Sequence, residues 1–176
     1  FNIDSKGGHW KGGSEAKTAL LLAFARVFYE HLGFYGEDLK LARMEQFVES
    51  QGKTDEFRAA FARVNGGDWL ADRANYEFFE DDIVEVMQEV LGMSREAAQH
   101  WFDGSERAAI SPDELTEQIV AYADRRAGEC GGTFRLLFMV DEVGQFIGSD
   151  VNLMLNLQTL VEDLGAKGAG RGWVLA

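Results

Sequence analysis

The sequence predicts an α/β protein, in which a parallel sheet of about three strands carries a large helical insertion. Short apolar stretches suited to strands occur at residues 1–4, 134–140 and 172–176. The middle one, FRLLFMV, is almost unbroken, as expected for a strand covered on both faces. Helical patterns fill both intervals, and parallel strands need such long crossovers.

The first predicted strand runs into a glycine-rich loop, GGHWKGGS. A phosphate-binding loop has the pattern G-x-x-x-x-G-K-[ST]. Gly7, Gly12 and Ser14 fit this spacing, but Gly13 stands where the phosphate-binding lysine belongs. We therefore interpret the stretch as a loop between a strand and a helix, and not as a phosphate site.

Helical periodicity then continues from Ser14 to Gly128 without a convincing strand. The strongest helix start is Ser111-Pro112-Asp113-Glu114, which combines an N-cap serine, a first-turn proline and a capping-box glutamate. The expected helices cover residues 14–33, 37–50, 54–64, 68–91, 95–102 and 111–126. A further helix is predicted at 151–164, ending at Gly165, before the last strand.

We accordingly expect residues 1–176 to form one partial domain. Within it, residues 1–13 are strand and loop, 14–128 are the helical insertion, and 133–176 are strand, helix and strand. The chain starts and stops within strand-like patterns, so we expect it to be an internal segment of a longer polypeptide.

The strand at 134–140 ends in two adjacent carboxylates, Asp141 and Glu142. This is the form of a Walker B motif, which makes the predicted sheet of the P-loop NTPase type. Asp141 can hold a nucleotide-bound Mg²⁺, and Glu142 can act as the catalytic base for the attacking water. A buried strand that leaves into an acidic loop is the plainer alternative.

Three further residues are candidate cofactor-binding groups for ATP. Asp4 and Ser5, together with Asn2, end the first strand, where a polar side chain can hold the Walker B glutamate; a simple strand-to-loop cap is the alternative. Arg171 lies in a glycine-rich loop and could reach a phosphate or a neighbouring subunit of a homo-oligomer. The alternative for Arg171 is a solvated surface role.

The three histidines and Cys130 lack metal-ligand spacing, which argues against zinc.

Composition limits the classes of partner. The formal net charge is −13, so we expect no direct binding of nucleic acid by this segment. The lone Cys130 cannot form an internal disulfide and fits a reducing, cytoplasmic location. No apolar run reaches the ~20 residues of a membrane span.

Longer stretches carry a resemblance. FARVFYEHLGF, DDIVEVMQEVLGMS and above all VDEVGQFIG and LMLNLQT resemble the large P-loop ATPases of BREX phage-defence systems, the BrxC/PglY family. The resemblance covers essentially the whole chain in order and is most specific from Phe134 onward. It implies a cytoplasmic ATPase that uses ATP and Mg²⁺ and works with other BREX defence proteins, including a DNA methyltransferase.

The family's Walker B carboxylates fall on Asp141 and Glu142, whereas its Walker A loop would precede Phe1. We therefore expect an ATPase in the intact protein and no activity from this segment alone. The alternative is a non-enzymatic helical interaction module with a degenerate nucleotide site.

Overall fold

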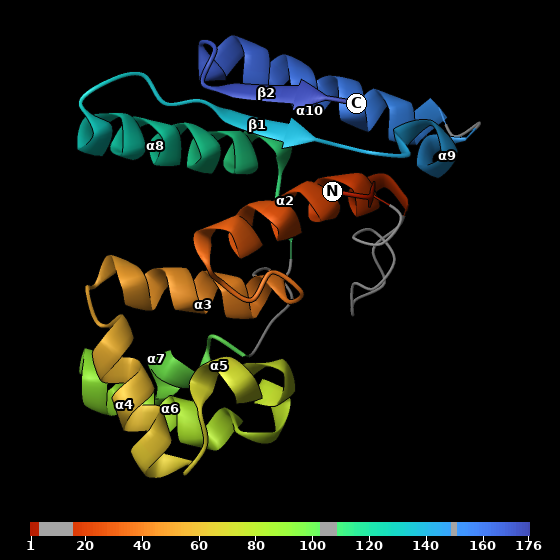
Figure 1. Ribbon diagram of the computed structural model, residues 1–176. Helices are drawn as coiled ribbons and strands as arrows, with labels where there is room; N and C mark the ends of the chain where they lie inside the picture. The colour runs from red at the N-terminus through yellow and green to blue at the C-terminus, as the bar shows by residue number, and fades with distance from the viewer. Residues whose placement is uncertain (4–15, 103–108, 149–150) are drawn as a thin grey trace. The chain divides into compact units, whose positions relative to one another are not determined.

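The computed structural model describes residues 1–3, 16–102, 109–148 and 151–176, and this part of the chain is mostly helical (Figure 1). Its sheet has two parallel strands, β1 (Leu136–Met139) and β2 (Gly172–Leu175). The prediction of a three-stranded α/β sheet of the P-loop type is therefore wrong. In the described residues 1–3, the predicted first strand contributes one isolated parallel bridge, between Asn2 and Asp141, and no neighbouring pair extends it into a ladder.

The chain divides into two compact units. The first combines Phe1–His31 with Ile110–Ala176, and the second is Leu32–Ala109. The second unit thus lies between the two parts of the first in sequence. Helices at both ends of the predicted insertion belong to the same unit as the strands.

The first unit contains the sheet and four helices among its described residues. They are α2 (Ala16–Leu32, whose last residue falls in the second unit), α8 (Pro112–Cys130), α9 (Val143–Ile147) and α10 (Val151–Gly168). α8 and α10 pack against each other and against β2. Gly172 makes this close packing feasible, because a Cβ there would lie only 3.0 Å from Leu164 and 3.5 Å from Ile119.

The sheet is covered on one face only. Phe138 and Val140 are buried, and the Phe138 ring lies 5.3 Å from that of Phe24 on α2. The opposite face exposes more than half of each apolar side chain, at Leu137, Met139, Trp173 and Leu175. The expectation of a strand covered on both faces is therefore wrong within the described chain.

The second unit is wholly helical in its described residues. It comprises α3 (Leu39–Ser50), α4 (Thr54–Val64), α5 (Trp69–Asp72), the 3₁₀ helix η1 (Arg73–Phe78), α6 (Glu80–Leu91) and α7 (Arg95–Gln99). Aromatic and aliphatic side chains fill its core, among them Met44, Phe61, Trp69, Ile83 and Met87. This unit thus has a hydrophobic core of its own.

Several predicted helices have different limits, and the one expected at 95–102 ends at Gln99. The expected helix at 68–91 is broken because Asn75 has non-helical angles (φ −112°, ψ 23°) and η1 separates α5 from α6. α8 continues past Gly128 to a left-handed C-cap at Gly131 (φ 65°). α10 continues through Gly165, since glycine within a helix costs only about 1 kcal/mol.

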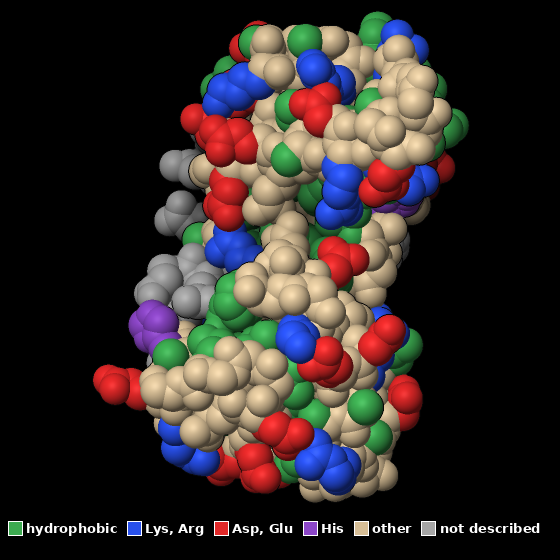
Figure 2. Space-filling model, turned by 90° about the vertical axis from the view of Figure 1, so that its left-hand side faces the viewer, with side chains coloured by type: hydrophobic (Ala, Val, Ile, Leu, Met, Phe, Trp, Pro, Cys, Tyr) green, Lys and Arg blue, Asp and Glu red, His purple; other side chains and the backbone are tan. Residues whose placement is uncertain are grey.

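Two further properties of the described chain are the distribution of charge on its surface and the length and apolar character of its helices. On the face shown in Figure 2, acidic and basic side chains are interspersed and neither sign forms a large continuous patch. None of the helices in the described ranges combines the length and the apolar character needed to cross a bilayer.

Candidate functional site

The two acidic residues predicted to bind a metal and to act in catalysis lie just beyond the carboxyl end of β1. Packing fixes this strand, because Phe138 and Val140 are buried on its covered face. The Val140 N–H also donates to the Leu175 carbonyl (2.8 Å), which extends the pairing with β2 by one bond. The backbone of Asp141 is thereby anchored while its side chain is exposed.

The N-terminal residues hold Asp141 from the other side. The Asp141 N–H donates to the Phe1 carbonyl (2.9 Å), and the Ile3 N–H donates to the Asp141 carbonyl (3.3 Å). The Phe1 ring packs edge-on against Phe24 of α2, with centroids 5.5 Å apart. Residues 1–3 therefore place Asn2 beside the acidic pair, although they form no strand.

Glu142 has an unusual backbone conformation. Its φ of 63° and ψ of 21° lie in the left-handed region, which costs a non-glycine residue about 1–3 kcal/mol. Its N–H donates to Oδ1 of Asp141 (2.9 Å), and its carbonyl accepts from Gln145 and Phe146 (3.0 Å each). These backbone contacts connect the end of β1 to α9 through a tight turn.

The side chain of Glu142 is held by Asn2. Nδ2 of Asn2 donates a hydrogen bond to Oε2 of Glu142, across 140 residues of sequence. A hydrogen bond to an ionised acceptor is roughly twice as strong as one between neutral groups. This contact fixes the orientation of Glu142, which is itself partly buried.

An open hollow of ≈ 360 Å³ adjoins Asp141 at this end of the sheet. Residues from the N-terminus, β1 and β2 line it: Phe1, Met139, Val140, Asp141, Leu175 and Ala176. Among the described residues of this lining, Asp141 is the only one with an acidic side chain. A ligand that enters the hollow from solvent can therefore reach this carboxylate.

The donor set suits a hard cation that brings most of its own ligands. Mg²⁺ in nucleotide sites binds one or two carboxylates, several waters and the phosphates of the substrate. Across the described ranges, no three His, Cys, Asp or Glu side chains gather into a complete metal cage. Asp141 and Glu142 offer carboxylate oxygens, the kind of ligand that Mg²⁺ takes in proteins.

The structure places Arg171 away from the acidic pair. The Arg171 carbonyl accepts a hydrogen bond from the Leu136 N–H (2.8 Å) at the amino end of β1. At about 3.3 Å per residue, this end of the strand lies about 16 Å from Asp141. The Arg171 guanidinium pairs with Asp124 of α8 and donates to the Gly168 carbonyl (3.3 Å). Arg171 and the carboxylates are thus not brought together within this chain.

Of the other predicted groups, some lie within the described residues and some lie outside them. Asp4, Ser5 and the loop GGHWKGGS lie outside the described residues, so their proposed roles stay predictions. Asn2, which the sequence analysis named together with Asp4 and Ser5, donates a hydrogen bond to Glu142. The sequence signal for Asn2 was its position in the short apolar stretch at the start of the chain. The parallel bridge between Asn2 and Asp141 brings it beside the acidic pair.

Comparisons with known proteins add no family to this description. No protein-family model matches the chain, and no solved structure matches it at a significant level.

Proposed function

We propose that this chain supplies the acidic half of a Mg²⁺–ATP site in an ATPase of a BREX-type phage-defence system. One observation carries the proposal: Asn2, Asp141 and Glu142 gather at the carboxyl end of β1, with Glu142 held by the Asn2 amide. The BREX context rests on the sequence resemblance alone. The proposal depends on this cluster and not on the size of the sheet.

Each of the three side chains has a separate role. Asp141, exposed beside the hollow, would hold the hydrated Mg²⁺ that neutralises nucleotide phosphates. Glu142 would orient the attacking water and accept its proton. Asn2 is a positioning residue, because its amide fixes the orientation of the Glu142 carboxylate.

The phosphates would need cationic or backbone N–H partners as well. The lining of the hollow contains no Lys or Arg side chain among the residues that the structure describes. We therefore propose that a phosphate-binding loop elsewhere in the intact protein completes the site. In that arrangement this chain alone has low affinity for ATP.

Substitution of the two carboxylates in the intact protein tests the assignment. Glu142→Gln should retain Mg²⁺–ATP binding and lower the hydrolysis rate about 10²–10⁴-fold, the usual contribution of a general base. Asp141→Asn should weaken the Mg²⁺ dependence of both binding and turnover. Glu117→Gln, an exposed carboxylate on α8, is the matched control. Normal ATP hydrolysis by both site variants would refute the proposal.

A second candidate function has one observation in its favour. The open sheet face of Leu137, Met139, Trp173 and Leu175 is apolar and contiguous in register, as protein-interaction surfaces often are. A non-enzymatic interaction module would use this face and leave Asp141 and Glu142 without a catalytic role. Absence of ATPase activity from the intact protein, with retained partner binding, would favour this candidate.

A further inference from the structure

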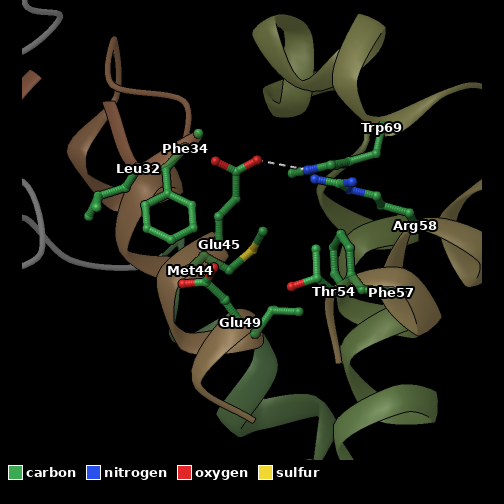
Figure 3. A pocket seen from close by; sticks show the side chains of 11 residues that line it. Leu32, Phe34, Met44, Glu45, Glu49, Thr54, Phe57, Arg58 and Trp69 are labelled. Atoms are coloured by element: carbon green, nitrogen blue, oxygen red, sulfur yellow. Dashed lines mark hydrogen bonds between the residues drawn. The ribbon is translucent and has the colours of Figure 1, made fainter. Parts of the chain in front are cut away.

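The second unit contains an apolar hollow that is independent of the acidic pair. Its volume is ≈ 100 Å³, and eleven residues line it (Figure 3). Leu32 and Phe34 lie on one side, and Thr54 and Phe57 lie on the other. An engineered apolar cavity of about 150 Å³ binds benzene. A hollow of two thirds that size is large enough for a branched aliphatic group.

The floor of the hollow is buried and apolar. Met44, Val48, Phe57 and Trp69 are each at most 3% exposed, and all belong to the core of this unit. The Phe57 and Trp69 rings pack edge-on, with centroids 5.1 Å apart. A ligand would therefore meet a preformed surface, which lowers the entropic cost of binding.

The one buried acid in the lining is already satisfied. Glu45 accepts hydrogen bonds from Nε1 of Trp69 and Nη1 of Arg73 (2.8 Å each) and from the Tyr35 N–H (2.5 Å). Arg73 also neutralises its charge. Glu45 therefore shapes the hollow and leaves ligand recognition to other groups.

Two exposed side chains of opposite charge complete the lining. Glu49 comes from α3 and Arg58 from α4, and Figure 3 shows them on different sides of the hollow. Neither side chain has a hydrogen-bond or ion-pair partner in the described part of the chain. Each can therefore accept a ligand group of opposite charge without breaking an existing contact.

We propose that this hollow binds a free aliphatic α-amino acid of about the size of leucine. The branched side chain would enter the apolar floor, the carboxylate would pair with Arg58, and the ammonium would pair with Glu49. A purely anionic ligand would meet repulsion from Glu49, and a purely cationic one would meet repulsion from Arg58. A zwitterion with an apolar side chain is the small ligand that complements all three parts of the lining.

Calorimetric titration of the 176-residue chain with L-leucine tests this proposal. We expect saturable binding of leucine and none of glycine, which lacks the apolar side chain. N-acetyl-L-leucinamide keeps the side chain but has neither charge, so its affinity should be at least tenfold weaker. Equal binding of N-acetyl-L-leucinamide would overturn the proposal in favour of an apolar side chain within a peptide. Absence of leucine binding would overturn it outright.

Variants of the exposed residues locate the site without threatening the fold. Glu49→Gln and Arg58→Gln should each raise the dissociation constant for leucine about tenfold, because each removes one charge-assisted contact. Arg63→Gln, on the same helix as Arg58 and paired with Glu89, should leave it unchanged. Thr54→Met should fill the hollow and abolish leucine binding while the chain stays folded. Unchanged leucine affinity in both charge variants would contradict the assignment.

Discussion

The buried carboxylate of Glu45 gives the sharpest stability prediction, because one side chain ties together three segments of the second unit. It accepts from the backbone of Tyr35, from the Trp69 indole and from the Arg73 guanidinium, and it is 9% exposed. Glu45→Ala removes all three acceptor contacts and leaves the guanidinium of Arg73, which is only 19% exposed, without its charge partner. Loss of one member of a buried ion pair costs about 3–5 kcal/mol.

We expect Glu45→Ala to lower the free energy of unfolding of this unit by about 3–5 kcal/mol, a large share of the 5–15 kcal/mol typical of whole proteins. Glu45→Gln keeps one carbonyl acceptor and should cost less, about 1–3 kcal/mol. Glu49→Ala, one turn later on α3 and exposed, is the matched control and should stay within about 0.5 kcal/mol.

The assay must report on the second unit alone, because the chain divides into two compact units and a two-state analysis applies to a single cooperative unit. Urea unfolding followed by the indole resonance of Trp101, which belongs to the same core as Trp69, meets this need. A cost below 1 kcal/mol for Glu45→Ala, or one equal to that of Glu49→Ala, would refute the reasoning that Glu45 joins these segments.

Three smaller predictions follow from other contacts. Burial and the hydrogen-bonded Asp38 raise the pKa of Tyr76 above its ordinary value. The stabilisation that this group contributes should therefore be fully present below about pH 10 and decline at higher pH. Tyr76→Phe should remove this decline, as measured by unfolding at a series of pH values. Ser111→Ala removes the side-chain cap on the Glu114 N–H and should cost about 1 kcal/mol by thermal unfolding, whereas Ser111→Asp should be nearly neutral. Gly172→Val would force Leu164 and Ile119 apart and should cost about 1–3 kcal/mol in urea unfolding, while equal stability would show that α8 and α10 can move aside.

Local signals predicted the helices well where capping chemistry was explicit. Ser111, Pro112 and Glu114 predicted the start of α8, and the structure confirms it, with the Ser111 hydroxyl accepting from the Glu114 N–H (3.1 Å). The end of α8 was missed because Gly128 fits within a helix and the left-handed cap forms at Gly131. Periodicity could not reveal the break at Asn75, since the apolar positions on either side keep the same spacing.

The sheet was harder to predict because its extent depends on long-range pairing. The apolar stretch at residues 1–4 resembles a strand in composition, yet only Asn2 forms a bridge with β1. The run ending at Val140 was correctly predicted as a strand, but its sequence alone suggested two covered faces, and Leu137 and Met139 are exposed. An unbroken apolar pattern shows that both faces are apolar and does not show what covers each one.

The candidate site was predictable in its carboxylates and only partly in its surroundings. Asp141 and Glu142 follow directly from the strand-end pattern, and the structure places them at the carboxyl end of β1. The left-handed turn at Glu142 and the short helix α9 had no signal, because neither glycine nor a capping side chain marks that position. The pairing of Arg171 with Asp124 required knowledge of how α8 packs beside β2.

Calorimetric titration of the intact protein with ATP, with and without Mg²⁺, tests the central claim most directly when the wild type is compared with Asp141→Asn. We predict that the wild type binds ATP more tightly in the presence of Mg²⁺ and that Asp141→Asn loses most of this difference while its fold is unchanged. An identical Mg²⁺ dependence in both proteins, or no ATP binding by the wild type, would contradict a metal–nucleotide site at the end of β1.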